Sequence, residues 1–469
     1  MSLGKCVKKR WLTLVTAALV LCAMPASAQG TARPAAAAGS HAYSIARAYV
    51  IRFYPRFLTY FQQSVGQSNR MVGPARVGPK LGIVVATNDD TIYGQFYLDL
   101  SEGPEILTIP KPNTTYSLAS IDVWGNVLQT NIPSGGYGTY ALVARGYNGP
   151  LPPNVTKVEV PYRLTFWLIR ADKYSATGQN LIAAAREFRD SLHLASLHDY
   201  IQNPQSGKTQ LLPLAVLAPR MKAIADEQAT TSPTQFLRFL QQGMGSPTTQ
   251  PFSGSDRRLA RSFNGVFAAA NRAAAHGDYG RISQIAQGTR DAHALIVDHW
   301  LSHLDSNRWI HFDNMGAWGT AYLDRASANE YIQFGNNAAA AKYYDAFTDH
   351  DGIPLDGSVI SDYQLTFSKS QIPDAKRFWS LTAYIPPAVE LVPNRARKYA
   401  VASYTPRLKT KRDGSVTIYI APKRPPGAPR ANWLPVPRGP FSLLLRVYGP
   451  TGNTSGTYLP PPIKAYGRL

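Results

Sequence analysis

The sequence predicts a mixed α+β protein with two antiparallel β-sandwich or jelly-roll-like domains and a helical module between them. Three observations favour this class. Between residues 81 and 170, short apolar runs alternate with Gly, Pro and Asn turns, which is typical of antiparallel strands. Alanine-rich amphipathic segments occupy residues 175–306. The pattern of strands and turns then returns in residues 307–469.

The N-terminus has the features of a secretory signal peptide, expected at residues 1–28. Basic residues precede an apolar run at 11–24, which is shorter than the ~20 residues that a membrane span needs. Pro25 ends the run, and the small residues up to Ala28 suit a signal peptidase. We therefore expect cleavage after Ala28, a periplasmic or secreted protein with no membrane span after signal removal, and a flexible linker at residues 29–40. The alternative is a retained membrane anchor.

The cysteine content and the net charge limit the chemistry and the binding partners that the protein can have. Both cysteines, Cys6 and Cys22, lie in the expected signal, so the mature chain would have no disulfide and no thiol nucleophile or ligand. The formal charge is +20, and the four basic residues of the signal would leave +16 (20 − 4). This charge either serves only as a solubilising surface or favours an anionic cell-surface polymer as a partner. No nucleic-acid partner is expected, because no DNA- or RNA-binding motif occurs. A homo-oligomer stays open.

The N-terminal domain is expected at residues 41–174, as one helix followed by strands. Aromatic residues recur every four positions between His41 and Phe61, which predicts a helix with a buried aromatic stripe. Pro55 is expected to kink or split this helix. Strands are expected at residues 83–85, 93–100, 105–109, 116–124, 140–144 and 162–170.

The helical module is expected at residues 175–306 and the C-terminal β domain at residues 307–469. Ser232 and Pro233 form a helix start, with serine as the N-cap and proline at the first helical position. One more helix is expected at residues 322–347, inside the C-terminal domain. The helices of the module are expected at residues 179–197, 214–227, 233–242, 256–276 and 282–304.

Several sequence blocks resemble a pair of bacterial families. Residues 87–94, Thr-Asn-Asp-Asp-Thr-Ile-Tyr-Gly, and residues 97–100 are similar to domain of unknown function 1254, although that family usually has Asn at the position of Asp89. The resemblance implies two β-sandwich or jelly-roll-like domains with helices between them, often in exported proteins, and no established reaction. The C-terminal partner, domain of unknown function 1214, is resembled by residues 316–325, 352–357, 378–382, 413–420, 431–435 and 441–448.

Acidic residues near position 90 form the candidate catalytic group. Asp89 and Asp90 stand at a strand entrance, and Asp122 lies on a later strand. Paired carboxylates act as acid and base when their surroundings separate their pKa values, and Tyr93 could assist. The same oxygens could bind calcium. An ordinary turn also places Asp and Asn in this way, with no catalysis.

Tryptophans beside Gly- and Asn-rich blocks predict a ligand-binding cleft. Aromatic faces stack on sugar rings, while amides and charged groups bind the hydroxyls. Packing in a β-domain core would use the same aromatic residues. Arg325 and Arg395 could pair with a ligand carboxylate, or each could hold a loop to a nearby Asp. The candidate ligand-binding residues are Asn88, Trp124, Trp318, Tyr322, Arg325, Trp379 and Trp433.

The sequence assigns no cofactor and no metal. His299 and His303 lie four residues apart on an expected helix, and this spacing could hold a metal. Position 300 is Trp, so the glutamate of the zinc-hydrolase pattern is absent. No Gly-x-Ser-x-Gly elbow, phosphate loop or dinucleotide-binding pattern occurs.

Together these residues favour an exported protein that binds a glycan or another small polar ligand in an aromatic-rich cleft. The alternative is a carboxylate-based hydrolase or lyase that acts on a saccharide or a similar polar substrate. A second alternative is a structural or assembly protein. Whether the protein is an enzyme stays open at this point.

Overall fold

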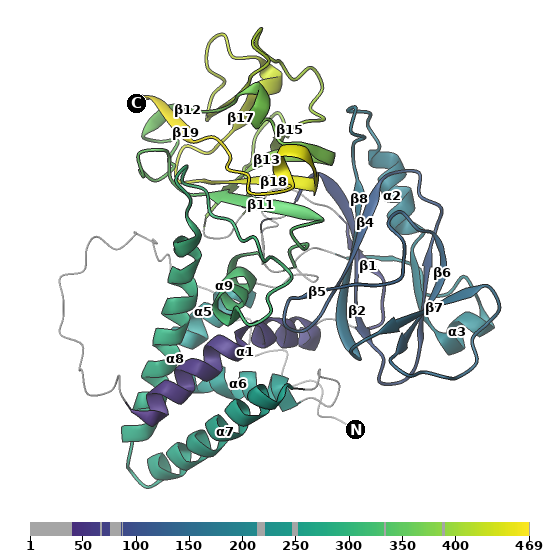
Figure 1. Cartoon of the computed structure of the whole chain (residues 1–469), viewed down its shortest axis with the longest axis vertical. Coiled ribbons are helices and arrows are strands. Elements are labelled where there is room, and N and C mark those ends of the chain that lie inside the picture. The colour runs from purple at the N-terminus through teal and green to yellow at the C-terminus, as the bar shows by residue number, and fades with distance from the viewer. Residues whose placement is uncertain are drawn as a thin grey trace. The chain divides into compact units, whose positions relative to one another are not determined.

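The computed structural model describes residues 40–65, 68–75, 86, 88–212, 221–245, 252–332, 334–386 and 390–468. The expected signal peptide, most of the linker and the strand expected at residues 83–85 lie outside these residues. The described part is a mixed α/β structure whose sheets are mostly antiparallel (Figure 1), so the predicted class is confirmed at this level. No helix among the described residues combines the length and apolar character that crossing a membrane requires.

Two sheets form the N-terminal β region. One has the strand order β10-β1-β2-β8-β4-β5 and the other the order β7-β6-β3-β9. A single apolar cluster contains Phe96 and Trp167 of the first sheet and Leu107 and Leu142 of the second. The strands are β1 (Val72–Pro74), β2 (Thr91–Asp99), β3 (Glu105–Ile109), β4 (Tyr116–Ile121), β5 (Val127–Leu128), β6 (Gly138–Ala144), β7 (Val155–Val160), β8 (Leu164–Asp172), β9 (His193–Ser196) and β10 (Gln210–Leu212).

The segment after β8 differs from the helical module expected from residue 175 onward. Only part of the expected helix at 179–197 forms, as α2 (Ile182–Asp190), and the short helix α3 (Leu197–Gln202) follows β9. Strand β9 pairs antiparallel with β3, and β10 pairs parallel with β1. Both strands therefore belong to the N-terminal sheets. Pairing with β3 decides the conformation here, because it buries Leu194 against the sheet core.

The helices of the module pack with α1 around one apolar cluster. α1 (His41–Val65) has the predicted aromatic stripe, since Tyr49, Phe53 and Phe57 are buried. The helix continues through Pro55, so the predicted split does not occur. Pro233 begins α6, as predicted, and residues 214–220 of the helix expected at 214–227 lie outside the described residues. The other helices are α5 (Met221–Thr231), α6 (Pro233–Gly245), α7 (Gly254–Ala275), α8 (Gly280–His299), the 3-10 helix η1 (Trp300–His303) and α9 (Tyr322–Tyr331).

Two further sheets form the C-terminal β region. One has the order β11-β18-β13-β14 with β15 paired to β13, and the other has the order β17-β16-β12-β19. The helix expected at residues 322–347 ends at Tyr331, and residues 341–346 form β11 instead, paired with β18. The elements are β11 (Ala341–Ala346), β12 (Ile360–Phe367), β13 (Ala375–Ile385), β14 (Glu390–Leu391), β15 (Ala400–Ala402), β16 (Val416–Ala421), β17 (Trp433–Pro435), β18 (Ser442–Pro450), β19 (Ile463–Arg468) and the 3-10 helices η2 (Lys369–Gln371), η3 (Arg430–Asn432) and η4 (Gly452–Thr454).

Candidate functional site

Asp90 is buried where the N-terminal and C-terminal β regions contact each other. Its carboxylate accepts hydrogen bonds from Ser380 Oγ at 2.6 Å and from the Tyr404 hydroxyl. Its side chain is 1% exposed. Asp89 forms an ion pair with Lys173 instead, with 2.7 Å between Oδ1 and Nζ. The two neighbouring carboxylates therefore have different partners.

Asn88 and Tyr93 extend this contact. Asn88 Nδ2 donates to the Tyr448 hydroxyl at 2.9 Å. Burial raises the pKa of Tyr93 above its ordinary value of 10.0. Arg446 is 3% exposed and lies within electrostatic reach of both Tyr93 and Asp90. The structure thus brings Asn88, Asp90 and Tyr93 into one buried polar network that joins the two β regions.

Asp122 closes a turn after β4. Its Oδ1 accepts from the backbone N–H groups of Trp124 at 2.8 Å and Asn126 at 2.9 Å, and its Oδ2 accepts from Asn126 Nδ2 at 3.0 Å. Gly125 in this turn has a φ of 79°, and a Cβ there would lie 2.6 Å from the Asn329 side chain. Only glycine fits that position. The partners of Asp122 are thus those of a turn, and none of them is a partner of Asp90.

Three predicted ligand-binding residues contact one another beside α1. The Arg325 guanidinium lies 4.6 Å from the ring centroid of Trp124 and 5.0 Å from that of Tyr322. Arg56 lies 4.9 Å from the Trp124 ring, and Arg52 lies 3.5 Å from the Tyr322 ring. We call this group the arginine–aromatic cluster; its members are Arg52, Arg56, Trp124, Phe252, Tyr322 and Arg325.

The buried arginines of this cluster have too few acceptors. Arg56 is 1% exposed, and its Nη1 and Nη2 have no hydrogen-bond partner in the part of the chain that the structure describes. Arg325 is 6% exposed, and its Nε likewise has none there, although its Nη2 donates to the backbone oxygen of Arg52 at 2.6 Å. Burial lowers the pKa of Arg56 and of Arg325 to about 10, so both stay charged at neutral pH. Buried cationic donors without acceptors are unusual, and an anion would satisfy them.

The edge of the cluster is open to solvent. Arg52 Nη1 lies 3.2 Å from Asp256 Oδ1, and both side chains are 16% exposed. Tyr322, which Arg52 covers, is also partly exposed. Arg52 and Arg325 therefore both contact the Tyr322 ring, which is partly exposed.

The other predicted tryptophans have different surroundings. Trp318 is buried, and its Nε1 donates to the Gly125 carbonyl at 2.9 Å, next to the cluster. Trp379 packs in the apolar core of the C-terminal β region. Trp433 is the one tryptophan among the described residues that is not buried. It lines a pocket of about 490 Å³ together with Arg395.

A second pocket, of about 580 Å³, is lined by four carboxylates and surrounds Glu105. Glu105 is 5% exposed; its Oε1 accepts from Asn69 Nδ2 at 2.9 Å, and its Oε2 has no partner among the described residues. Burial, and then the charges of Asp199, Glu102 and Asp99, raise the pKa of Glu105 to about 8. A carboxyl group that is protonated at neutral pH can act as a general acid.

The comparisons with known proteins agree with the sequence blocks. Residues 68–196 match the family described as Protein of unknown function (DUF1254), and residues 340–452 match Protein of unknown function (DUF1214). The predicted family pair is confirmed. No curated protein matches the chain.

Two solved structures resemble this chain. The crystal structure of the VPA0106 protein from Vibrio parahaemolyticus is 18% identical, covers 91% of this chain and 100% of its own, and has a TM-score of 0.57. A putative uncharacterized protein from Burkholderia cenocepacia is 13% identical, with 91% and 94% of the two chains covered and a TM-score of 0.41. The first likeness shows that the fold is shared.

Three candidate functional residues were not identified from the sequence: Arg52, Arg56 and Glu105. Arg52 and Arg56 lie outside both matched segments, and only their spacing of four residues on an aromatic helix face could have indicated a paired role. Glu105 had no signal, because it is a single acid at the start of an apolar strand. Its pocket is completed by Asn69 and Asp199, which are distant in sequence.

Proposed function

We propose that this protein binds a small anionic polar ligand, such as an acidic saccharide, at the arginine–aromatic cluster. The observation that carries the proposal is a pair of buried guanidinium groups beside the Trp124 ring: among the described residues, Nη1 and Nη2 of Arg56 and Nε of Arg325 have no acceptor. Guanidinium groups bind carboxylates, sulfates and phosphates in a fork geometry. Aromatic faces next to them suit the C–H face of a sugar ring. The basic composition of the chain supports an anionic rather than a neutral ligand.

Replacing Arg56 with methionine tests this proposal. The ligand-free variant is expected to have about the stability of the wild type: a buried cation whose Nη1 and Nη2 have no acceptor among the described residues is removed, while the buried Asp122 loses part of the positive charge that offsets its own. Ligand affinity is expected to fall about 100-fold, since the anion loses its charged donor. Urea unfolding measures the first effect. Thermal shift and calorimetry with uronate oligosaccharides, and with neutral oligosaccharides of equal length, measure the second.

Arg395→Met is the matched control, because Arg395 is an exposed arginine in the Trp433 pocket. It should leave acidic-oligosaccharide binding unchanged. Loss of binding in Arg395→Met or Trp433→Ala, with binding intact in Arg56→Met, would move the ligand to that second pocket. Equal binding of neutral and acidic oligosaccharides would contradict the role given to the arginines.

A carboxylate-based hydrolase or lyase is the second candidate function, and Glu105 favours it. The raised pKa keeps this carboxyl group protonated near neutral pH, and Asp99 and Asp199 in the same pocket are candidate bases. The predicted catalytic residues have less support; they are Asp89, Asp90, Tyr93 and Asp122. The carboxylates of Asp90 and Asp122 already accept hydrogen bonds from neighbouring groups of the protein.

The second candidate predicts that Glu105→Gln abolishes turnover of an acidic polysaccharide, followed by the release of reducing ends. Glu187→Gln is the control, because Glu187 also accepts an asparagine amide, from Asn113 at 3.2 Å, but is exposed. Turnover that survives Glu105→Gln would exclude this pocket as the catalytic site.

Two broader features complete the proposal. Each β region is proposed to be a sandwich or jelly-roll-like pair of sheets, which is supported by shared apolar cores such as that of Leu365 with Leu445.

Export to the periplasm or the medium, with cleavage after Ala28, is proposed from residues 1–28. N-terminal sequencing of the protein from the periplasmic fraction tests it, and an intact Met1 would contradict it. An anionic surface polymer and a second copy of the chain stay as proposed partners.

A further inference from the structure

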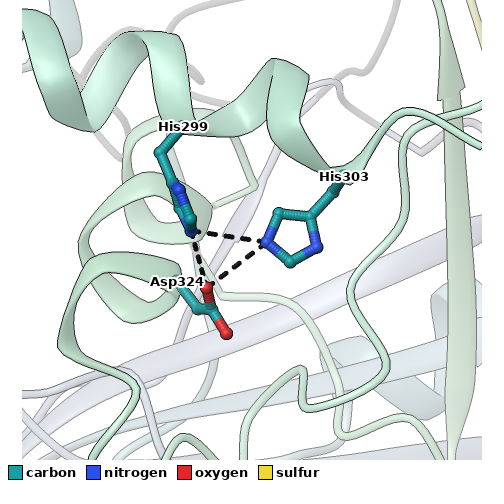
Figure 2. A group of neighbouring side chains, drawn as sticks. All are labelled: His299, His303 and Asp324. Carbon is teal, nitrogen blue, oxygen red and sulfur yellow. Dashed lines mark hydrogen bonds and ion pairs between the residues drawn. The ribbon is translucent and has the colours of Figure 1, made fainter.

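A second group of side chains converges at the end of α8, apart from the features used so far. His299 ends α8 and His303 ends η1, so the two imidazoles lie four residues apart. Asp324 of α9 lies against both rings (Figure 2). Asp324 Oδ1 is 2.7 Å from His299 Nε2 and 3.3 Å from His303 Nε2, and the two Nε2 atoms are 3.4 Å apart.

We propose that His299, His303 and Asp324 form a zinc site. A tetrahedral zinc ion with bonds of roughly 2.0–2.1 Å holds its ligand atoms about 3.3 Å from one another. Two of the three observed separations already have this value. The third, between His299 and Asp324, is a hydrogen-bond distance and would lengthen when a metal replaces the proton between these atoms.

Hydrogen bonds around His299 leave its Nε2 lone pair available. The Ser302 hydroxyl lies 2.7 Å from the His299 carbonyl and 3.1 Å from His299 Nδ1. A hydroxyl has one hydrogen, and the shorter contact to the carbonyl uses it, so the ring Nδ1 is the donor in the other contact. A neutral His299 therefore presents its Nε2 lone pair to Asp324 Oδ1, and these two acceptors require a proton or a metal ion between them.

The other two ligands are also oriented by neighbours. Asn314 Nδ2 donates to Asp324 Oδ2 at 2.8 Å, which leaves Oδ1 for the metal. The His303 ring stacks on Phe312, with 3.9 Å between the centroids. Such supporting contacts are typical of metal sites in proteins. The three ligand side chains are 20%, 26% and 21% exposed, so water can reach the fourth position, as in zinc sites that keep an open place for a substrate or water.

This site could not be predicted from the sequence alone, because the local spacing identifies only the two histidines. The missing third ligand is Asp324, 21 residues beyond His303. The other His-containing group, Asp226, His293 and Glu330, is a poorer candidate, because the Tyr54 hydroxyl already donates to the Glu330 carboxylate.

Calorimetry with ZnCl₂ on tag-free, chelator-treated full-length protein tests the proposal. One zinc ion per chain is expected. His303→Ala should weaken binding about 100-fold or more, and Asn314→Ala about 10-fold, because it removes a supporting contact only. His276→Ala, at an exposed histidine after α7, should leave affinity unchanged. Substituted Co²⁺ should give the intense visible absorption of a tetrahedral site.

Asp324→Asn is the second test variant if His303→Ala does not fold, because it preserves the size of the side chain and removes the charge. Asp324→Asn should also lose zinc affinity, and zinc should no longer raise its Tm. Wild-type zinc affinity in Asp324→Asn or His303→Ala would overturn the proposal. Loss of binding only in His293→Ala would overturn it as well, because zinc would then occupy the other group. Neither result bears on the arginine–aromatic cluster, whose test uses oligosaccharides without zinc.

Discussion

Replacing Asp90 with alanine is expected to lower the free energy of unfolding by about 4 kcal/mol. The substitution leaves the Ser380 and Tyr404 hydroxyls buried with no carboxylate to accept their hydrogen bonds. Each buried donor without an acceptor costs roughly 1–3 kcal/mol. Arg446, which is also buried, loses a negative charge that offsets its own. Urea unfolding followed by circular dichroism measures the change.

Asp89→Asn is the matched control, one residue away. It removes only the ion pair with Lys173, whose two side chains are partly exposed. Such pairs contribute about 1 kcal/mol or less. Asp90→Asn should fall between the two, because an amide keeps one acceptor oxygen but not the charge. If Asp90→Ala were as stable as the wild type, Asp90 would not hold the β regions together, and its candidacy as a catalytic carboxylate would rise, because catalytic residues are often kept at a cost in stability.

The contrast between Asp89 and Asp90 also shows which features of this region can be predicted from the sequence. The acidic block was identified, and the strand after it was predicted, because apolar alternation is a local pattern. The burial of Asp90 depends on Ser380 and Tyr404, which are 290 and 314 residues away. No local pattern carries information on such a contact.

The errors in secondary structure have a similar cause. Residues 341–346 follow an alanine-rich run and were expected to be helical, but all six pair with β18. Residues 193–196 were likewise expected in a helix, and four ladder positions join that segment to β3. Pairing with a distant strand overrides local helix preference in both places. The helix α1 and its buried face were predicted correctly, although not its continuation through Pro55, because the aromatic stripe is a local signal of the helix itself.

The candidate site was predicted in part for the same physical reason. Trp124, Tyr322 and Arg325 were selected for their residue type, and the fold brings them together. Chemistry therefore identified members of the site, while their grouping needed coordinates. Trp379 was selected on the same grounds and lies in the apolar core. Residue type alone does not separate a binding tryptophan from a packing one.

The stability of the protein is expected to depend on pH through Glu105. Its pKa is about 8 in the folded protein and near the ordinary value of 4.5 in the unfolded chain, because burial and three nearby carboxylates disfavour the charged form. Between these values the folded protein holds a proton that the unfolded chain releases. The free energy of unfolding should therefore fall as pH rises from 4.5 to 8, by at most about 1.4 kcal/mol per pH unit. The contribution is fully present below pH 4.5.

Glu105→Gln isolates this effect, because glutamine keeps the acceptor for Asn69 Nδ2 and never ionises. At pH 4 the variant should have the same free energy of unfolding as the wild type. At pH 9 its free energy of unfolding should be higher by about 3 kcal/mol. This difference is smaller than the limit of about 1.4 kcal/mol per pH unit implies, because water in the pocket weakens the effect of burial. Glu187→Gln, at the exposed glutamate bonded to Asn113, should differ from the wild type by the same small amount at every pH. A difference between Glu105→Gln and the wild type that does not change with pH would mean that Glu105 ionises normally. The general-acid role would then fail with it, because that role requires the same retained proton.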